Sequence, residues 1–470
     1  MPFDFEEIDR IINARSLAIV GASKSPIKFG FFHTMSQTTV GFDGPMYLVN
    51  PKEKEIMGMP AYPDLPSLPE VPDLVCLTIP AHHSMDVLRD CARLGVKGVI
   101  MIAAGFKEIG EKGRALEEEA LDLARVGGFR IIGPNCFGIY NPRNGLTLVP
   151  GFDFSRTPGD VAFISQSGGF SVHLAREGQS LGIGFSAVIS YGNAADLNEA
   201  DFLRYFSRDP QTSIIAGYLE GAGDGRDFAD ALADAAAAKP VVLWKVGKHD
   251  SSRRAVVSHT GSLAGASEIW EALLSQAGAI EVSGIDEMID VLIALKKLGP
   301  NPGKRLLISG GGGGIGTYGA DLAEAEGLEV PALAAESLAK MQSVLGRTGA
   351  VAGNPLDIGM PLIPLPEFEG SMREAALNST TDVLIFDLAV NFALPIVTGE
   401  GLEKACDILI QVRRESGKPV AVVLYSRACD PGDLTFEGIM RSMRQTLLDA
   451  GVAVFPSMPR AIRAIAKINS

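Results

Sequence analysis

Short apolar runs rich in β-branched residues alternate with longer segments of helical periodicity, and this alternation most constrains how the chain can fold. Examples of the apolar runs are residues 16–22, 73–80 and 161–165. Strands that are buried on both faces read as continuous apolar runs, and parallel strands are joined by helical crossovers. The pattern therefore predicts an α/β protein built from parallel sheets that are covered by helices.

The alternation divides into three units. Candidate strands of the first unit are 16–22, 45–50, 73–80, 98–103 and 129–133, with helical patterns at 83–94 and 111–126. After the turn-rich stretch 142–160, the second unit has candidate strands at 161–165, 185–190, 213–220 and 240–247 and ends in a helical pattern at 284–298. The third unit has candidate strands at 305–311, 382–390, 419–425 and 452–457. We expect domains at 1–143, 155–299 and 303–470.

Composition excludes several classes of function. A chain of 470 residues with 46% hydrophobic content can bury several cores, and its formal charge of −14 gives no broad attraction to nucleic acid or anionic lipid. The five cysteines are far apart and form no CxxC pair, which is typical of reduced thiols. No stretch approaches about 18 uninterrupted apolar residues, and the acidic N-terminus does not look like a signal peptide. We expect a cytoplasmic protein with no membrane or nucleic-acid partner.

A glycine turn at the end of the first strand predicts a nucleotide-type ligand. Gly21 ends this strand, and the N–H groups of the following helix would face a phosphate there. The turn lacks the second glycine of GxGxxG, so the pattern alone is weak. The candidate ligand residues in this turn are Gly21, Ala22, Ser23, Lys24 and Ser25.

The end of the second strand favours a phosphorylated ribose. An NAD enzyme places Asp or Glu there on the ribose hydroxyls, whereas this chain has Asn50, Pro51 and Lys52. A lysine suits an additional phosphate, as in coenzyme A or NADP, although an ordinary solvated lysine explains it equally well. The loops that contain Pro80 and Asn135 also follow strands, and turn chemistry alone can account for them.

Two further strand-to-helix turns are candidate anion sites. In ISQSGG, Ser165 stands where a GxSxG hydrolase turn needs glycine, so Ser167, Gly168 and Gly169 are interpreted as N–H donors at a helix start. In SGGGGGIG, a GxGxxG match is almost automatic, yet Gly312, Gly313 and Gly314 could hold an anion at a helix N-terminus.

His259 differs from the other five histidines in its surroundings. It lies in AVVSHTGSLAGA, among small and hydroxyl residues and after a basic patch. No second ligand stands at i+4, which argues against a metal site, and we expect no metal there. The local sequence supports a nucleophilic histidine only weakly.

The motifs GASKSPIKFG, NPK, GPNCFG, VAFISQSGG, YLEG and SHTGSLAG occur in this order along essentially the whole chain. In this the sequence resembles the alpha subunit of ADP-forming acetyl-CoA synthetases, relatives of succinyl-CoA synthetase. The resemblance implies a Rossmann-like domain that binds coenzyme A, followed by two flavodoxin-like domains that hold a phosphohistidine.

The resemblance also implies roles for particular residues. His259 of SHTGS would take the phosphoryl group, and Glu220 of YLEG would pair with its other ring nitrogen. Ser167, Gly168 and Gly169 would hold the phosphate, with Gly312 to Gly314 as a second cradle. The implied cycle converts acyl-CoA and phosphate to acyl phosphate and CoA, then forms phosphohistidine, and finally delivers the phosphoryl group to ADP.

The nucleotide module of this family, an ATP-grasp domain, is missing from the three units. The resemblance therefore implies a separate ATP-grasp beta subunit that carries ATP or ADP and Mg²⁺, together with self-association of the alpha chains and a carboxylic acid or acyl-CoA substrate. Two alternatives stay open: a non-catalytic protein that binds CoA or acyl-CoA on the same fold, and a nicotinamide-dependent oxidoreductase, which Asn50-Pro51-Lys52 disfavours.

Overall fold

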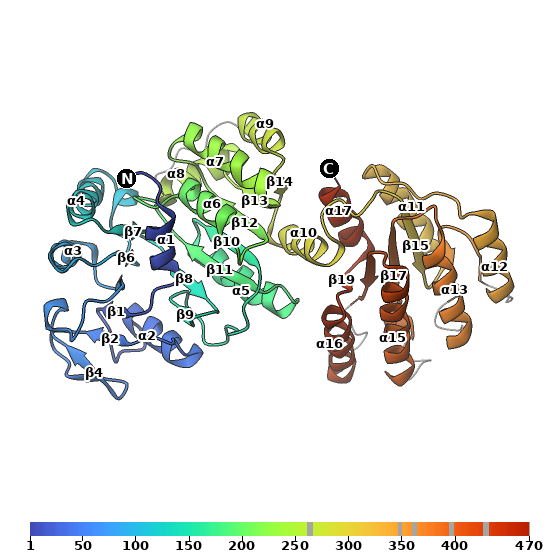
Figure 1. The fold of residues 1–470 in the computed structure, drawn as a ribbon, viewed down its shortest axis with the longest axis horizontal. Coiled ribbons are helices and arrows are strands. Elements are labelled where there is room, and N and C mark those ends of the chain that lie inside the picture. The colour runs from blue at the N-terminus through green and yellow to red at the C-terminus, as the bar shows by residue number, and fades with distance from the viewer. Residues whose placement is uncertain (261–266, 346–349, 360–363, 394–398, 426–431, 470) are drawn as a thin grey trace. The chain divides into compact units, whose positions relative to one another are not determined.

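The computed structural model describes residues 1–260, 267–345, 350–359, 364–393, 399–425 and 432–469. The chain forms two compact units, Met1–Met288 and Ile289–Ser470, which we describe separately. Unit 1 contains two sheets and unit 2 contains one, and helices flank all three (Figure 1). The described residues thus confirm the predicted α/β class with mainly parallel sheets, while the three domain limits stay a prediction.

The first sheet has the strand order β3-β4-β2-β1-β5-β6-β7. It is parallel except for the short β3–β4 pair. Its strands are β1 (Leu17–Val20), β2 (Met46–Val49), β3 (Glu55–Ile56), β4 (Met59–Tyr62), β5 (Leu74–Leu77), β6 (Gly98–Met101) and β7 (Arg130–Ile132). The helices of this part are α1 (Phe5–Ile12), α2 (Phe29–Val40), α3 (Ala81–Leu94) and α4 (Glu111–Gly127), with short 3-10 turns at Leu65–Ser67 and Lys107–Ile109.

The second sheet has the order β14-β13-β12-β10-β11-β8-β9. Its strands are β8 (Gly138–Asn141), β9 (Leu146–Thr147), β10 (Val161–Ser165), β11 (Phe185–Ser190), β12 (Ile214–Leu219), β13 (Val241–Lys245) and β14 (Ile280–Val282). Its helices are α5 (Gly168–Ser180), α6 (Glu199–Arg208), α7 (Gly225–Ala238), α8 (Asp250–Thr260) and α9 (Ser267–Ala277). The antiparallel strand β8 pairs with β11, so the segment after β7 joins the second sheet.

A buried ion pair connects the two sheets of unit 1. Arg130 of β7 is 2% exposed, and its guanidinium donates to both carboxylate oxygens of Asp196, from Nε to Oδ2 at 2.9 Å and from Nη2 to Oδ1 at 3.0 Å. Asp196 also accepts a hydrogen bond from the backbone N–H of Ile131. A bidentate pair of this kind sets the register of two elements as well as holding them together.

Unit 2 contains a five-stranded parallel sheet of order β16-β15-β17-β18-β19. Its strands are β15 (Leu306–Gly310), β16 (Leu356–Asp357), β17 (Val383–Asp387), β18 (Val420–Val423) and β19 (Ala453–Phe455). Helix α10 (Ile285–Leu298) begins in unit 1 and continues into unit 2. The other helices of unit 2 are α11 (Gly313–Ala325), α12 (Ala335–Leu345), α13 (Leu365–Leu377), α14 (Val390–Ala393), α15 (Gly399–Ser416), α16 (Leu434–Asp449) and α17 (Met458–Ile468).

Alternation along the strands of unit 2 sends successive side chains to opposite faces. Leu307, Leu384 and Phe386 join the apolar core that α12, α13, α15 and α16 cover. Ile308 faces α11 instead, since a Cβ on Gly319 of that helix would lie 3.2 Å from its Cγ2. Side chains in register with Ile308 therefore point toward α11.

Candidate functional site

The turn after β1 is shaped by two close approaches of the backbone. Gly21 has φ +91°, and a Cβ there would lie 2.7 Å from Ile79 Cγ2. A Cβ on Gly30, in the first turn of α2, would lie 2.0 Å from the Gly21 carbonyl oxygen. Gly30 therefore lets α2 start directly against the turn. Neither α2 nor α3 has a side-chain cap, so N–H groups at both helix starts are available to a ligand.

Asn50 connects the first two loops of this sheet edge. Its Nδ2 donates to the Ala22 carbonyl oxygen at 2.8 Å, and its Oδ1 accepts from the backbone N–H of Lys52 at 2.8 Å and of Glu53 at 3.2 Å. The Asn50 side chain therefore uses these hydrogen bonds to hold the turn after β1 against the loop after β2. Glu53 in turn pairs with Lys24, with Nζ and Oε2 2.7 Å apart, and Lys52 is exposed.

The structure brings together most of the expected residues of the first sheet. Strands β2, β1 and β5 are neighbours, so the turn 21–25, the loop 50–52 and Pro80 at the start of α3 lie at one edge. Asn135 follows β7, which β6 separates from β5. Its Nδ2 donates to Asn193 Oδ1 at 3.3 Å, so it faces a loop of the second sheet.

Asn193 is a residue that the sequence reasoning missed. Besides its contact with Asn135, its Nδ2 donates to Glu108 Oε2 at 2.6 Å and to Glu117 Oε2 at 3.2 Å, and Lys107 Nζ donates to its backbone carbonyl at 2.5 Å. It therefore connects loops from both sheets of unit 1. The only local signal is the Gly192-Asn193 turn after β11.

The turn between β10 and α5 presents an open helix start. The Ser167 hydroxyl accepts from the backbone N–H of Phe170 at 3.4 Å, and Ser165 Oγ accepts from the Ser167 N–H at 3.1 Å. Gly169 is exposed, and among the described residues, apart from the backbone of its own helix, the nearest atom to a Cβ placed on it is Ser167 Oγ, 3.9 Å away. The first turn of α5 thus has room for an anion beside its N–H groups.

Glu220 lies at the end of β12, next to this turn. It is 4% exposed, and the side chain of Gln166 accepts hydrogen bonds from the backbone N–H groups of Glu220 at 2.5 Å and Gly221 at 3.1 Å. The Tyr218 hydroxyl donates to Glu220 Oε1 at 3.4 Å. Gln166, which the sequence reasoning also missed, thus fixes Glu220 relative to the start of α5.

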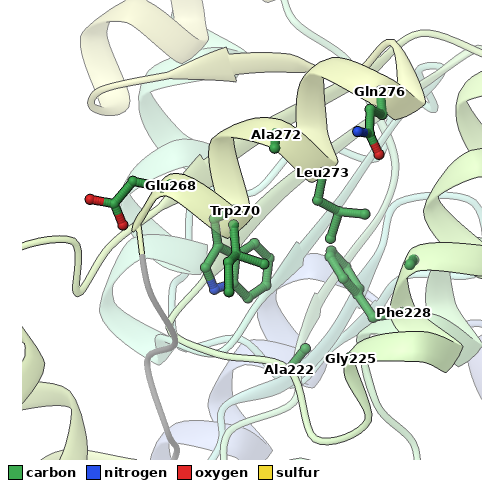
Figure 2. A pocket seen from close by; sticks show the side chains of 10 residues that line it. Ala222, Gly225, Phe228, Glu268, Trp270, Ala272, Leu273 and Gln276 are labelled. Carbon is green, nitrogen blue, oxygen red and sulfur yellow. The ribbon is translucent and has the colours of Figure 1, made fainter.

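Lys245 supports the same loop from β13. Its Nζ donates to the backbone carbonyl of Glu220 at 2.9 Å and lies 4.9 Å from the centre of the Trp270 ring. Burial lowers the pKa of Lys245 to about 8. A cavity of about 650 Å³ between α7 and α9 is lined by Ala222, Phe228, Trp270 and Leu273 (Figure 2).

A second buried carboxyl lies near Glu220. Glu199, at the start of α6, is 2% exposed and accepts a hydrogen bond from the backbone N–H of Gly223 at 3.1 Å. Burial raises the pKa of Glu199 to about 7. Burial raises the pKa of the Tyr191 hydroxyl well above its usual range, and the charges of Glu199 and Glu220 raise it further.

Two expected contacts are not described. His259 belongs to α8, but its side chain and residues 261–266 lie outside the described part of the chain. The pairing of His259 with Glu220 therefore stays a prediction. Gly312, Gly313 and Gly314 form the start of α11 in unit 2, so whether they share a phosphate with Ser167 also stays a prediction.

The described residues contain no group of three or more His, Cys, Asp or Glu side chains arranged to hold a metal ion. Among the described helices, none has the length and apolar character needed to cross a bilayer.

Two family models match unit 1, and the second match extends a few residues into unit 2. The CoA binding domain matches residues 15–142, and the succinyl-CoA ligase like flavodoxin domain matches residues 158–295.

Curated relatives match along nearly the whole chain. The acetate–CoA ligase (ADP-forming) II subunit alpha of Pyrococcus furiosus is 36% identical over 426 residues, which are 89% of this chain and 90% of that protein. Acetate–CoA ligase (ADP-forming) I of Archaeoglobus fulgidus is 36% identical over 98% of this chain, and the chain spans 63% of that protein.

A solved structure of a related acetyl-CoA synthetase has a similar fold. Acetyl-coenzyme A synthetase 1 of Ca. Korarchaeum cryptofilum, in complex with phosphate and ADP, is 30% identical with a TM-score of 0.84, over 98% of this chain and 96% of that chain. By its sequence and its fold, this chain belongs to the family of ADP-forming acetate–CoA ligases, within which it matches the alpha subunit.

Proposed function

We propose that this chain is the CoA-binding, phosphohistidine-carrying subunit of a nucleoside-diphosphate-forming acyl-CoA ligase. The observation that carries the proposal is the geometry around Glu220, a buried acid that Gln166 holds against the open start of α5. A carboxylate on one imidazole nitrogen fixes the tautomer and increases the nucleophilicity of the other, and helix N–H groups stabilise a phosphate.

Coenzyme A would lie at the edge of the first sheet. The turn 21–25, the loop 50–52 and Pro80 bring together two helix starts without side-chain caps and the exposed lysines Lys24 and Lys52. These groups fit the phosphates of CoA. Asn135 and its partner Asn193 lie toward the second sheet, where the thioester end of the ligand would meet phosphate.

The proposed reaction has three reversible steps. An oxygen of hydrogen phosphate attacks the thioester carbonyl, the C–S bond breaks, and CoA leaves as the thiol with the proton that phosphate released. His259 then attacks the phosphorus of the acyl phosphate and releases the carboxylate. Phosphohistidine finally transfers the phosphoryl group to ADP. Ser167, Gly168 and Gly169, with Gly312, Gly313 and Gly314, would hold the phosphate oxygens, while Glu220 orients His259.

We propose that ADP and Mg²⁺ are bound by a separate ATP-grasp subunit. The Pyrococcus furiosus relative is a subunit of similar length, whereas the Archaeoglobus fulgidus relative extends well beyond the matched region. The Korarchaeum protein is described in complex with phosphate and ADP. A carboxylic acid or acyl-CoA is the proposed substrate, and alpha chains are expected to associate with one another.

Transfer of phosphate from labelled acetyl phosphate to the full chain tests this function. We expect an acid-labile, base-stable label on His259, none in His259→Ala, and labelling slowed by on the order of 10²-fold in Glu220→Gln. The labelled chain should discharge to ADP only after an ATP-grasp subunit is added. His249→Ala, a change to an exposed histidine before α8, is the matched control and should label normally.

Calorimetry with CoA distinguishes the alternatives. We expect CoA to bind, and His259→Ala to bind it within about threefold of the wild type, because the expected CoA residues lie on the first sheet whereas His259 belongs to α8, and substitutions at sites that share no partners act independently. Label on a serine, or on the His259→Ala chain, would contradict the mechanism. CoA binding with no label on the wild type would identify a non-catalytic CoA-binding protein.

A further inference from the structure

The start of α11 in unit 2 is flanked by two carboxyl groups in one row of the sheet. Gly310 of β15 pairs in register with Asp357 of β16. On the other side, Ser309 pairs with Phe386, which places Gly310 beside Asp387 of β17. Asp357 and Asp387 are two strand spacings apart, a distance of about 10 Å across the sheet. Gly310 itself has no side chain, and Ile315 of α11 packs over its backbone.

Both carboxyl groups lie on the face of the sheet that α11 covers. A Cβ on Gly310 would lie 3.2 Å from Ile315 Cγ2 in the first turn of α11 and 3.8 Å from Asp387 Cβ. A Cβ on Gly313 would lie 3.2 Å from Asp357 Oδ2. The row Asp357, Gly310, Asp387 therefore forms a floor beneath the helix start.

The helix start itself offers donors. Gly312 provides no side-chain cap, and Gly313 and Gly314 are exposed. Their N–H groups can reach a ligand from solvent, and the helix dipole favours an anion there. A helix start by itself would not identify a site, but the acid beside it adds an independent observation.

Asp387 has unused hydrogen-bonding capacity. It is 1% exposed, its Oδ1 accepts from the Ala389 N–H at 2.8 Å, and its Oδ2 has no hydrogen-bond partner among the described residues. A buried carboxylate oxygen without a partner is costly, so a ligand that donates a hydrogen bond would stabilise it. Burial raises the pKa of Asp387 to about 6. Burial also raises the pKa of the Tyr425 hydroxyl, and the nearby charges of Asp387 and Tyr318 raise it further.

We propose that the start of α11 binds hydrogen phosphate and that Asp387 accepts the hydrogen bond of its P–OH group, with Asp357 as the second acid of the floor. This inference rests on the proposed phosphate cradle at Gly312 to Gly314, and it adds a reason why the site would bind hydrogen phosphate and reject sulfate. Helix N–H groups need an acceptor, whereas an ionised carboxylate needs a donor. Hydrogen phosphate supplies both, while sulfate at neutral pH carries no proton and would place its charge against Asp387.

Hydrogen–deuterium exchange of the full chain can test this at the site itself, since a peptide that covers residues 309–318 reports the helix start. At pH 7.5 we expect phosphate to slow exchange there at a concentration at least about tenfold lower than sulfate requires, because a missing hydrogen bond beside a buried charge costs about that factor. Lowering the pH to 5 protonates Asp387 and should reduce the preference for phosphate over sulfate, since the protonated acid can then donate a hydrogen bond to sulfate.

Two variants and a control complete the design. Asp387→Asn can donate a hydrogen bond, so sulfate should protect the peptide nearly as well as phosphate, and Asp357→Asn should weaken the preference in the same direction. Asp449→Asn, on the exposed end of α16, is the matched control and should behave as the wild type. Equal protection by both anions in the wild type, protection by neither, or an unchanged preference in Asp387→Asn would overturn the inference. Labelling of His259 is read separately, so the ligase proposal stands or falls independently.

Discussion

Burial changes the ionisation of single side chains in this protein, and Glu199 shows how. It accepts a hydrogen bond from Gly223, and the charge of Lys107 offsets only part of the effect of burial, so its pKa rises to about 7. The folded protein therefore keeps a proton on Glu199 at pH values where the unfolded chain has released it. The stability gained in this way is fully present below the ordinary glutamate pKa and is lost as the pH rises through 7.

We predict that Glu199→Gln becomes relatively more stable as the pH rises. Glutamine keeps the acceptor for Gly223 but cannot ionise. Between pH 4.5 and 7.5, the free energy of unfolding of the variant minus that of the wild type should increase by on the order of 2 kcal/mol. Urea unfolding followed by tryptophan fluorescence measures this in unit 1, because both tryptophans, Trp244 and Trp270, lie there.

Glu118→Gln, on the exposed side of α4, is the control and should show no such pH dependence. A stability difference for Glu199→Gln that stays constant from pH 4.5 to 7.5 would show that Glu199 ionises normally in the folded protein.

At the scale of elements, the bidentate pair between Arg130 of β7 and Asp196 joins the first sheet to the loop after β11. Removing one partner of a buried pair leaves the other charge uncompensated, which costs more than the pair itself contributes. We predict that Arg130→Met lowers the free energy of unfolding of unit 1 by about 3–5 kcal/mol.

Arg125→Met provides the comparison, because Arg125 forms an exposed pair with Asp122 on α4 and should change stability by less than about 1 kcal/mol. Adding Asp196→Asn to Arg130→Met should restore part of the loss, because the carboxylate nearest the removed guanidinium is then neutral, while Asp201, 3.8 Å from Arg130 Nη2, still lacks its partner. If the double variant is less stable than Arg130→Met, the loss comes from packing and not from the buried charge.

At the scale of the whole molecule, the chain forms two compact units, and an ion pair inside unit 2 tests whether they unfold separately. Arg460 of α17 donates to both carboxylate oxygens of Asp290 in α10, from Nε to Oδ2 at 2.5 Å and from Nη2 to Oδ1 at 3.0 Å. The Asp290 side chain is 5% exposed. We predict that Arg460→Met lowers the melting temperature of unit 2, seen by calorimetry, and leaves the tryptophan transition of unit 1 unchanged.

Arg463 also belongs to α17, and its ion pair with Glu326 is more exposed. We expect Arg463→Met, which removes this pair, to shift the calorimetric transition much less. A tryptophan transition that moves together with the calorimetric one in Arg460→Met would show that the two units unfold as one.

Long apolar runs determined most strands from the sequence alone. The candidate strands at 161–165 and 185–190 are β10 and β11 with the expected limits, because every residue of both runs is buried. The pairs β3–β4 and β8–β9, and the short strands β14 and β16, were not expected. These strands have four residues or fewer and stand at or near sheet edges, where pairing partners and not local pattern decide whether a strand forms.

The sequence by itself located the turns that face a ligand, because glycine spacing and helix starts are local properties of the chain. It pointed to Gly21, to Ser167 and to the glycines at the start of α11 without any knowledge of the sheets. Only the tertiary structure decided what surrounds these turns. Gln166 reaches Glu220 across 54 residues of sequence, Asn193 reaches Glu108 across 85, and Asp387 meets Gly310 through strand register. Such contacts depend on which strands are neighbours, and burial then sets the charge that each acid carries, so no local pattern could have predicted them.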